Sequence, residues 1–154
     1  MKAVNPYLNF AGNTEEAFNF YKSVFGGEFT MVARFRDFGG EAMGIPETAL
    51  DKIMHIALPL GGDTTLMGTD AMECMGQPLS EGNNFSISLE ADSGAEAETL
   101  FRRLSEGGRV TMPLGKTEWA EKFGACADRF GVQWMLNYTG SVRLGEQGRS
   151  TGTE

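Results

Sequence analysis

The feature that most constrains this chain is an internal repeat with a period of about 80 residues. Glu16-Ala17 recurs as Glu96-Ala97, and each pair opens a run with apolar residues at helical spacing. Gly-Gly pairs at 26–27 and 107–108 follow the two runs and are expected to end both helices. Each run therefore predicts an amphipathic helix. The matched apolar positions are Ala17/Ala97, Phe20/Leu100, Tyr21/Phe101 and Val24/Leu104.

The order of the predicted strands repeats as well. Alternating apolar patterns between turn residues predict strands at 4–10, 28–35, 52–59 and 64–68 in the first half, and at 85–91, 109–112, 122–127 and 132–137 in the second. Asn13 or Thr14 is expected to cap the first helix, and Asp92-Ser93 the second. Each half is then strand, helix, strand, strand, strand. The sequence predicts an α+β fold made of duplicated βαβββ units.

These units set the expected domain organisation. A βαβββ unit cannot cover both faces of its sheet alone, so two units are expected to pack together and enclose a cavity. We expect a single domain over 1–140, with halves at about 1–70 and 84–138. Glycine and proline punctuate the linker between them. The stretch 141–154 is polar and glycine-rich, which predicts a disordered tail.

Charge and hydropathy limit the partners. The net charge of −8 disfavours binding to nucleic acid or to an anionic membrane surface. No apolar run approaches the ~20 residues that a membrane span needs, and the start of the chain has no signal-peptide pattern. The two cysteines, Cys74 and Cys126, do not form a disulfide framework. We therefore expect a cytoplasmic protein.

Several local sequences resemble the PhnB-like branch of the vicinal oxygen chelate superfamily, which is also described as glyoxalase/bleomycin resistance-like or demethylubiquinone methyltransferase-like. They run from Asn5 to Asn137 and include Pro6–Phe10, Glu16–Tyr21, Phe25–Gly27, Met54-His55, Trp119 with Phe123-Gly124, and Asp128–Trp134. The resemblance implies the duplicated βαβββ fold, a homodimer and a small-molecule ligand. Members of the superfamily include glyoxalases, ring-cleaving dioxygenases and antibiotic-sequestering resistance proteins.

The resemblance also implies where a metal would be bound. Metal-dependent relatives hold one divalent ion with four His, Glu or Gln side chains, from the first and fourth strands of each half. The positions matched here are Asn5, Met67, Ser86 and Met135. A thioether is a poor ligand for such ions, and amide and hydroxyl groups are weak ones. We therefore expect no metal and no cofactor. A register shifted by two would bring Asn9, Glu90 or Asn137 to the site, still without a second histidine.

The remaining candidate residues are aromatic or titratable. His55 is a weak candidate for an acid/base group, and the alternative is a half-buried structural histidine. Trp119 and Phe123 either cover a sheet edge or form a lid over a ligand. The full predicted ligand-binding set is Asn5, Tyr7, His55, Met67, Ser86, Trp119, Phe123 and Met135. No residue is assigned a catalytic role beyond the weak candidate.

The function predicted from these residues is binding of a small, partly apolar molecule in a cavity between the βαβββ modules, with the metal site lost. Two alternatives stay open: a metal-dependent glyoxalase-type lyase or isomerase, and sequestration of a cationic antibiotic. Whether any reaction is catalysed is not determined by the sequence. Neither expected strand-to-helix turn contains G-x-G, which favours a glyoxalase-like lyase over a methyltransferase with a nucleoside methyl donor.

Overall fold

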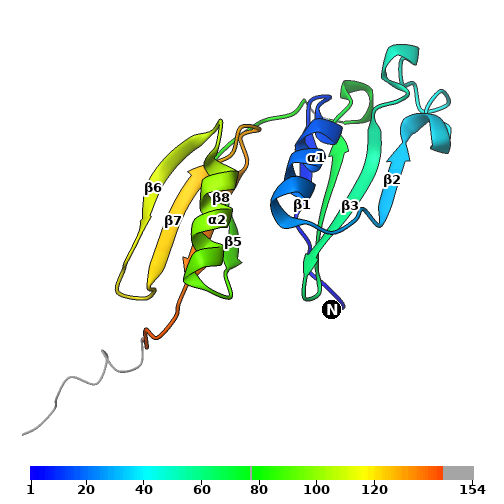
Figure 1. The fold of residues 1–154 in the computed structure, drawn as a ribbon. Coiled ribbons are helices and arrows are strands. Elements are labelled where there is room, and N and C mark those ends of the chain that lie inside the picture. Colours follow the sequence, from blue (N-terminus) through cyan, green and yellow to red (C-terminus); the bar gives the residue numbers. More distant parts are fainter. Residues whose placement is uncertain (77, 144–154) are drawn as a thin grey trace, which may run out of the picture. The chain divides into compact units, whose positions relative to one another are not determined.

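A computed structural model describes residues 1–76 and 78–143. It divides into two compact units, one spanning Met1–Glu81 and one that begins at Gly82. Each unit contains a four-stranded mixed sheet and one α-helix, in the order strand, helix, strand, strand, strand (Figure 1). The predicted α+β fold of duplicated βαβββ units is confirmed. Within the described residues, no helix is both long and apolar enough to cross a membrane.

The first unit has the strand order β1-β4-β3-β2. Strand β1 (Tyr7–Phe10) pairs in parallel with β4 (Thr64–Asp70), and the other neighbours are antiparallel. Strand β3 covers Ile53–Gly61 and β2 covers Met31–Arg34. The predicted strand 28–35 extends beyond β2 at both ends, and after β2 the chain turns directly into a 3₁₀ helix at Phe35–Phe38. Further 3₁₀ turns lie at Glu47–Ala49 and Glu73–Met75.

The second unit repeats this topology with the strand order β5-β8-β7-β6. Its strands are β5 (Ile87–Glu90), β6 (Arg109–Gly115), β7 (Lys122–Ala127) and β8 (Gln133–Tyr138). Again the first and last strands are parallel neighbours and the rest are antiparallel. Of the predicted tail at 141–154, residues 144–154 lie outside the described residues. Ser141 is described, and its hydroxyl donates to Glu121 at 2.6 Å.

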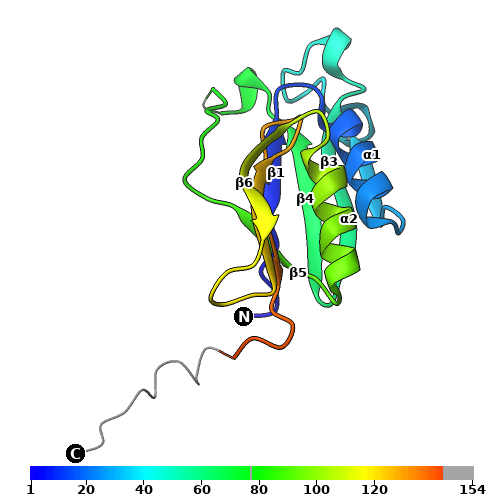
Figure 2. The ribbon, with the colours of Figure 1, turned by 60° about the vertical axis from the view of Figure 1, so that its left-hand side comes forward.

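Helix α1 (Thr14–Phe25) and helix α2 (Gly94–Ser105) each cover one face of the sheet in their own unit (Figures 1 and 2). The repeat-matched Tyr21 and Phe101 are buried, whereas Phe20 and Leu100 are both half-buried. Phe18, which the helical spacing left out, is fully buried instead. The helical spacing thus predicted which face of each helix is buried, but it missed Phe18, one of the most buried residues of α1.

In both units an aromatic ring of the helix packs directly against a glycine of the sheet. A Cβ at Gly68 would lie 2.6 Å from Phe18 Cε2, and a Cβ at Gly124 would lie 2.9 Å from Phe101 Cε2. Such distances are shorter than any ordinary carbon–carbon contact, so only glycine lets the rings approach. The two contacts also define which side of each sheet faces its helix. We call the opposite side the open face.

The two helices begin differently. Ser93 Oγ accepts a hydrogen bond from the backbone N–H of Glu96 at 3.0 Å, which confirms the predicted cap of α2. The Asn13 side chain makes no such bond at α1. Instead Thr14 donates both its backbone N–H and its hydroxyl to Asp70 Oδ1, at 3.0 and 2.7 Å. Asp70 also accepts from the backbone N–H of Ile53 at 2.7 Å, so a buried carboxylate joins the helix start to two strands.

Candidate functional site

The open face of the first sheet carries three of the predicted ligand-binding residues, Tyr7, His55 and Met67. Leu8 and Ile56 pair with Gly68 and are buried towards α1. Side chains alternate along a strand, so the intervening residues point to the open face. These open-face residues are Tyr7 and Asn9 on β1, Thr65, Met67 and Thr69 on β4, and His55 and Ala57 on β3.

Tyr7 and His55 form the polar centre of this face. Tyr7 Oη lies 3.0 Å from His55 Nδ1, and the two ring centroids are 5.5 Å apart. Strand β4 lies between β1 and β3, with Met67 directly beside Tyr7 in the parallel ladder. The Tyr7 side chain therefore reaches across β4 to meet the imidazole. When neutral His55 carries its proton on Nε2, Tyr7 donates to Nδ1 and the Nε2–H remains a second donor.

The surroundings keep the Tyr7 phenol protonated. Desolvation by partial burial raises the pKa of Tyr7, and a hydrogen bond with the Thr69 side chain lowers it by less. Tyr7 nevertheless remains 44% exposed, so its ring and hydroxyl are accessible to a ligand. The arrangement offers an aromatic surface, the Met67 thioether and, in this tautomer, one free hydrogen-bond donor, the His55 Nε2–H. It is suited to a molecule with an apolar body and an acceptor oxygen.

Asn5 lies at the edge of the open face of the first sheet, two residues before β1 begins. Its side-chain oxygen accepts a hydrogen bond from the backbone N–H of Thr65 at 2.9 Å, just before β1 begins. This bond fixes the approach of the chain to β4. The residue that lies beside Met67 in the ladder is Tyr7, two positions after Asn5.

The open face of the second sheet carries a different set. Met135 lies beside Ser88 in the parallel ladder, whereas Ser86 is exposed and precedes β5. Phe123 pairs with Asn137 on this face and is buried beneath Trp119, with ring centroids 5.2 Å apart in an edge-to-face arrangement. Trp119 is 42% exposed. It therefore covers Phe123 on the sheet surface, while Trp134, next to Met135, is fully buried on the helix side.

A hydrogen-bonded carboxylate that the sequence did not single out as a main candidate lies on the same open face. Glu90 Oε2 accepts from the Asn137 side-chain amide at 2.5 Å, and Oε1 accepts from the backbone N–H of Thr139 at 3.0 Å. Desolvation would raise the pKa of Glu90, but these hydrogen bonds outweigh it and hold the pKa below its ordinary value. Glu90 meets the Asn137 amide because the parallel ladder places the two residues side by side, a register that the sequence alone does not reveal.

The donor set does not fit the divalent metal site of metal-dependent relatives. Within the described residues there is no group of three or more His, Cys, Asp or Glu side chains that could hold an ion. In the first unit, the matched positions offer the Asn5 amide oxygen, already bonded to Thr65, and the Met67 thioether. A thioether prefers soft ions over Zn²⁺, Mn²⁺ or Ni²⁺. In the second unit, they offer the Ser86 hydroxyl and another thioether.

Two βαβββ units, each with one helix on one face of its four-stranded sheet, are the fold of the vicinal oxygen chelate class of proteins. The fosfomycin resistance protein FosX of Mesorhizobium loti shares this fold with a TM-score of 0.59, over 96% of this chain and 97% of that chain. At 14% identity the likeness concerns the fold alone.

Within that class, the family model described as 3-demethylubiquinone-9 3-methyltransferase matches residues 2–137, so the chain belongs to this PhnB-like family. Protein YjdN of Escherichia coli is 31% identical over 144 residues, which cover 87% of this chain and 93% of YjdN. The crystal structure of PA1353 from Pseudomonas aeruginosa is 44% identical with a TM-score of 0.77, over 88% of this chain and 96% of that one. The PhnB protein of Bacillus cereus is 28% identical with a TM-score of 0.70, over 88% and 98%.

Proposed function

We propose that this chain binds a small, partly apolar molecule at the open face of the first sheet, without a divalent metal ion. The observation that carries the proposal is the hydrogen bond between Tyr7 and His55, with Met67 beside Tyr7 in the ladder. An accessible tyrosine ring beside a thioether supplies an apolar contact surface. The Nε2–H of His55, whose ring is held by the Tyr7 hydroxyl, supplies orientation through an acceptor oxygen on the ligand.

The charge around the pair fits a neutral ligand. Tyr7 is a neutral phenol, since partial burial raises its pKa above an ordinary value that already lies well above neutral pH. Three cations of the first unit are paired with carboxylates, Arg34 with Glu15, Arg36 with Asp51 and Lys22 with Glu28. A phosphonate or another dianion would need such cations beside it. The proposed ligand class is therefore an uncharged aromatic or aliphatic molecule with a carbonyl or similar acceptor group.

The test is calorimetric titration of the full chain with aromatic carbonyl compounds, beginning with acetophenone. We expect Tyr7→Phe to weaken binding about two- to tenfold, the loss that corresponds to one neutral hydrogen bond, because the imidazole that donates to the ligand is no longer held by the Tyr7 hydroxyl. Tyr138→Phe is the matched control, since its ring lies at the helix side, 3.7 Å from the Cβ position of Gly94. EDTA is expected to leave binding unchanged.

Two results would contradict the proposal. One is equal affinity of the wild type and Tyr7→Phe for every compound that binds. The other is binding that disappears with EDTA and returns with Zn²⁺ or Mn²⁺, which would support the metal-dependent alternative. His55→Gln adds a second check, because it removes the imidazole while leaving an amide of similar reach. It should weaken the same ligands as Tyr7→Phe does.

A further inference from the structure

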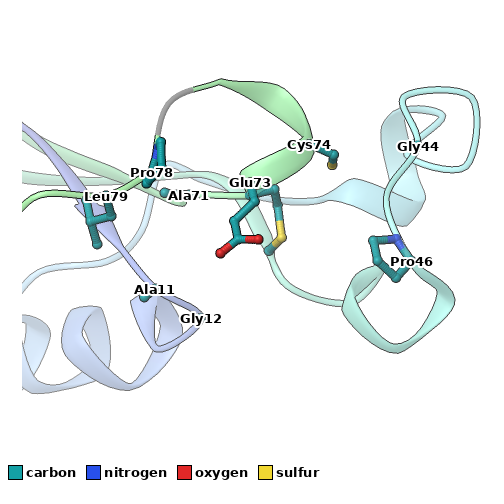
Figure 3. A pocket seen from close by; sticks show the side chains of 10 residues that line it. Ala11, Gly12, Gly44, Pro46, Ala71, Glu73, Cys74, Pro78 and Leu79 are labelled. Atoms are coloured by element: carbon teal, nitrogen blue, oxygen red, sulfur yellow. The ribbon is translucent and has the colours of Figure 1, made fainter.

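A second cavity lies in the first unit, away from the Tyr7–His55 pair. Its volume is about 640 Å³, within the range of small-molecule sites. It opens where the chain leaves the carboxyl ends of the parallel strands β1 and β4 (Figure 3). Tyr7 lies at the other end of β1, roughly 13 Å from Ala11 at 3.3 Å per residue. The lining residues are Ala11, Gly12, Gly44, Pro46, Ala71, Met72, Glu73, Cys74, Pro78 and Leu79.

The walls of this cavity are held in place by contacts within the unit. The backbone N–H of Ala71 donates to the Phe10 carbonyl at 2.7 Å, which ties the two strand exits together. Met72 packs against a buried cluster of Phe35, Ile45 and Leu50. Ile45 in turn lies between two lining residues, Gly44 and Pro46. The Met72 side of the cavity thus rests on packed side chains.

Glu73 gives the cavity its polarity. Of the described lining residues it alone carries a charge at neutral pH, and the other walls are mostly apolar. Its carboxylate points into the space between the Gly12 and Pro46 walls in Figure 3. None of the ion pairs among the described residues involves Glu73. The nearby Lys52 is bound to the Gly12 carbonyl at 2.9 Å and does not line the cavity.

We propose that this cavity binds a small organic cation with an apolar body, such as an aralkylammonium compound, with Glu73 facing the positive charge. An apolar wall with one carboxylate complements a cation that carries a hydrocarbon group, and it opposes an anion. The net charge of −8 adds a favourable long-range attraction. The proposal is independent of binding at the open face of the sheet.

Cys74 provides a reporter inside the cavity. It is exposed and lines the wall, whereas Cys126 is buried in β7. Burial raises the pKa of Cys126 to about 11, which suppresses its thiolate at neutral pH. Iodoacetamide should therefore modify Cys74 of the native full chain, and mass spectrometry of the peptides gives its rate. A ligand in the cavity covers the thiol and slows this reaction.

The experiment compares benzyltrimethylammonium with neutral benzyl alcohol and anionic phenylacetate. We expect saturable protection of Cys74 by the cation, weaker protection by the alcohol and none by phenylacetate. Glu73→Gln should raise the dissociation constant for the cation about two- to fivefold, the range for an ion pair that stays in contact with water. Asp63→Asn, an exposed carboxylate in the β3–β4 turn, is the matched control and should bind as the wild type does.

Three outcomes would overturn the proposal. The first is equal protection by phenylacetate and the cation. The second is equal affinity of the wild type and Glu73→Gln. The third is protection of Cys74 that depends on protein concentration alone, which would mean that a second copy of the chain covers the cavity. Tyr7→Phe should leave protection by the cation unchanged, so failure at the open face and failure here are distinguishable.

Discussion

Tyr7 and His55 are 48 positions apart in the chain, yet the Tyr7 hydroxyl lies 3.0 Å from His55 Nδ1. The pair spans three strands, because β4 separates β1 from β3, and the Tyr7 side chain also interacts with Thr69 on β4. Such a pair depends on strand order and register together. It joins the only histidine of the sequence to an accessible aromatic on the sheet face that no α-helix of its own unit covers.

The first prediction concerns alkaline pH. Burial raises the pKa of Tyr7 in the folded state, so the folded chain holds that proton more tightly than the unfolded chain. The stability from this group is complete below the pKa of the unfolded tyrosine, about 10, and is lost as pH rises through the folded value. Denaturant titrations should show that Tyr7→Phe loses less stability above pH 10 than the wild type.

The second prediction concerns metal content. The four positions that match the metal ligands of relatives supply an amide, a hydroxyl and two thioethers. Protein purified without chelators is therefore expected to contain no stoichiometric transition metal after dialysis. Elemental analysis that finds about one Zn, Ni, Mn or Fe per chain would be incompatible with this expectation.

The third prediction concerns the contact between Phe18 and Gly68. A Cβ at position 68 would lie 2.6 Å from the Phe18 ring, so Gly68→Ala must displace the helix or the ring. We expect a loss of ~1–3 kcal/mol in the free energy of unfolding, the usual cost of overpacking. Gly115→Ala is the control, because nothing lies within 4 Å of its Cβ position on β6. Equal stability of the two variants by urea denaturation would argue against a tight contact.

The fourth prediction concerns assembly. Both sheets leave edge strands, and apolar residues on β2 and β6 are exposed, including Val32 at 44% and Met112 at 47%. Unpaired edges are normally covered by another chain or element, and two-fold dimers are the commonest solution. Light scattering at micromolar concentration should give about twice 16.7 kDa. A chain that lacks residues 144–154 should also form a dimer. A monomer, for the full chain or for the shortened one, would refute the prediction.

The fifth prediction concerns the methyltransferase in the family description. The turn from β1 to α1 is Ala11-Gly12-Asn13, and the one before α2 is Asp92-Ser93. Neither is the glycine-rich turn that brings backbone amides close to a nucleotide cofactor. S-adenosylmethionine should therefore produce no concentration-dependent rise in melting temperature. A saturable rise would indicate a cofactor site of another kind.

Much of the fold follows from local sequence. The repeated helical spacing identifies Tyr21 and Phe101 as buried positions because a 3.6-residue period is an intrinsic property of the backbone. The strand 122–127 was predicted with the bounds that β7 has. The cap by Ser93 is likewise a local interaction, between residues three positions apart. By contrast, the first residue of α1, Thr14, is bonded to Asp70, which is 56 positions away in the chain. No local pattern indicates that partner.

The candidate site was predictable as a set of residues but not as an arrangement. The sequence by itself determined the duplicated units, the PhnB-like family and the candidacy of Tyr7, His55 and Met67. The parallel register of β1 on β4 decided that Tyr7, rather than Asn5, lies beside Met67. Only the tertiary structure brought Glu73 together with the loops at Gly12 and Pro46 around one cavity. Local spacing encodes periodicity, whereas pairing register and loop closure depend on contacts between residues far apart in the chain.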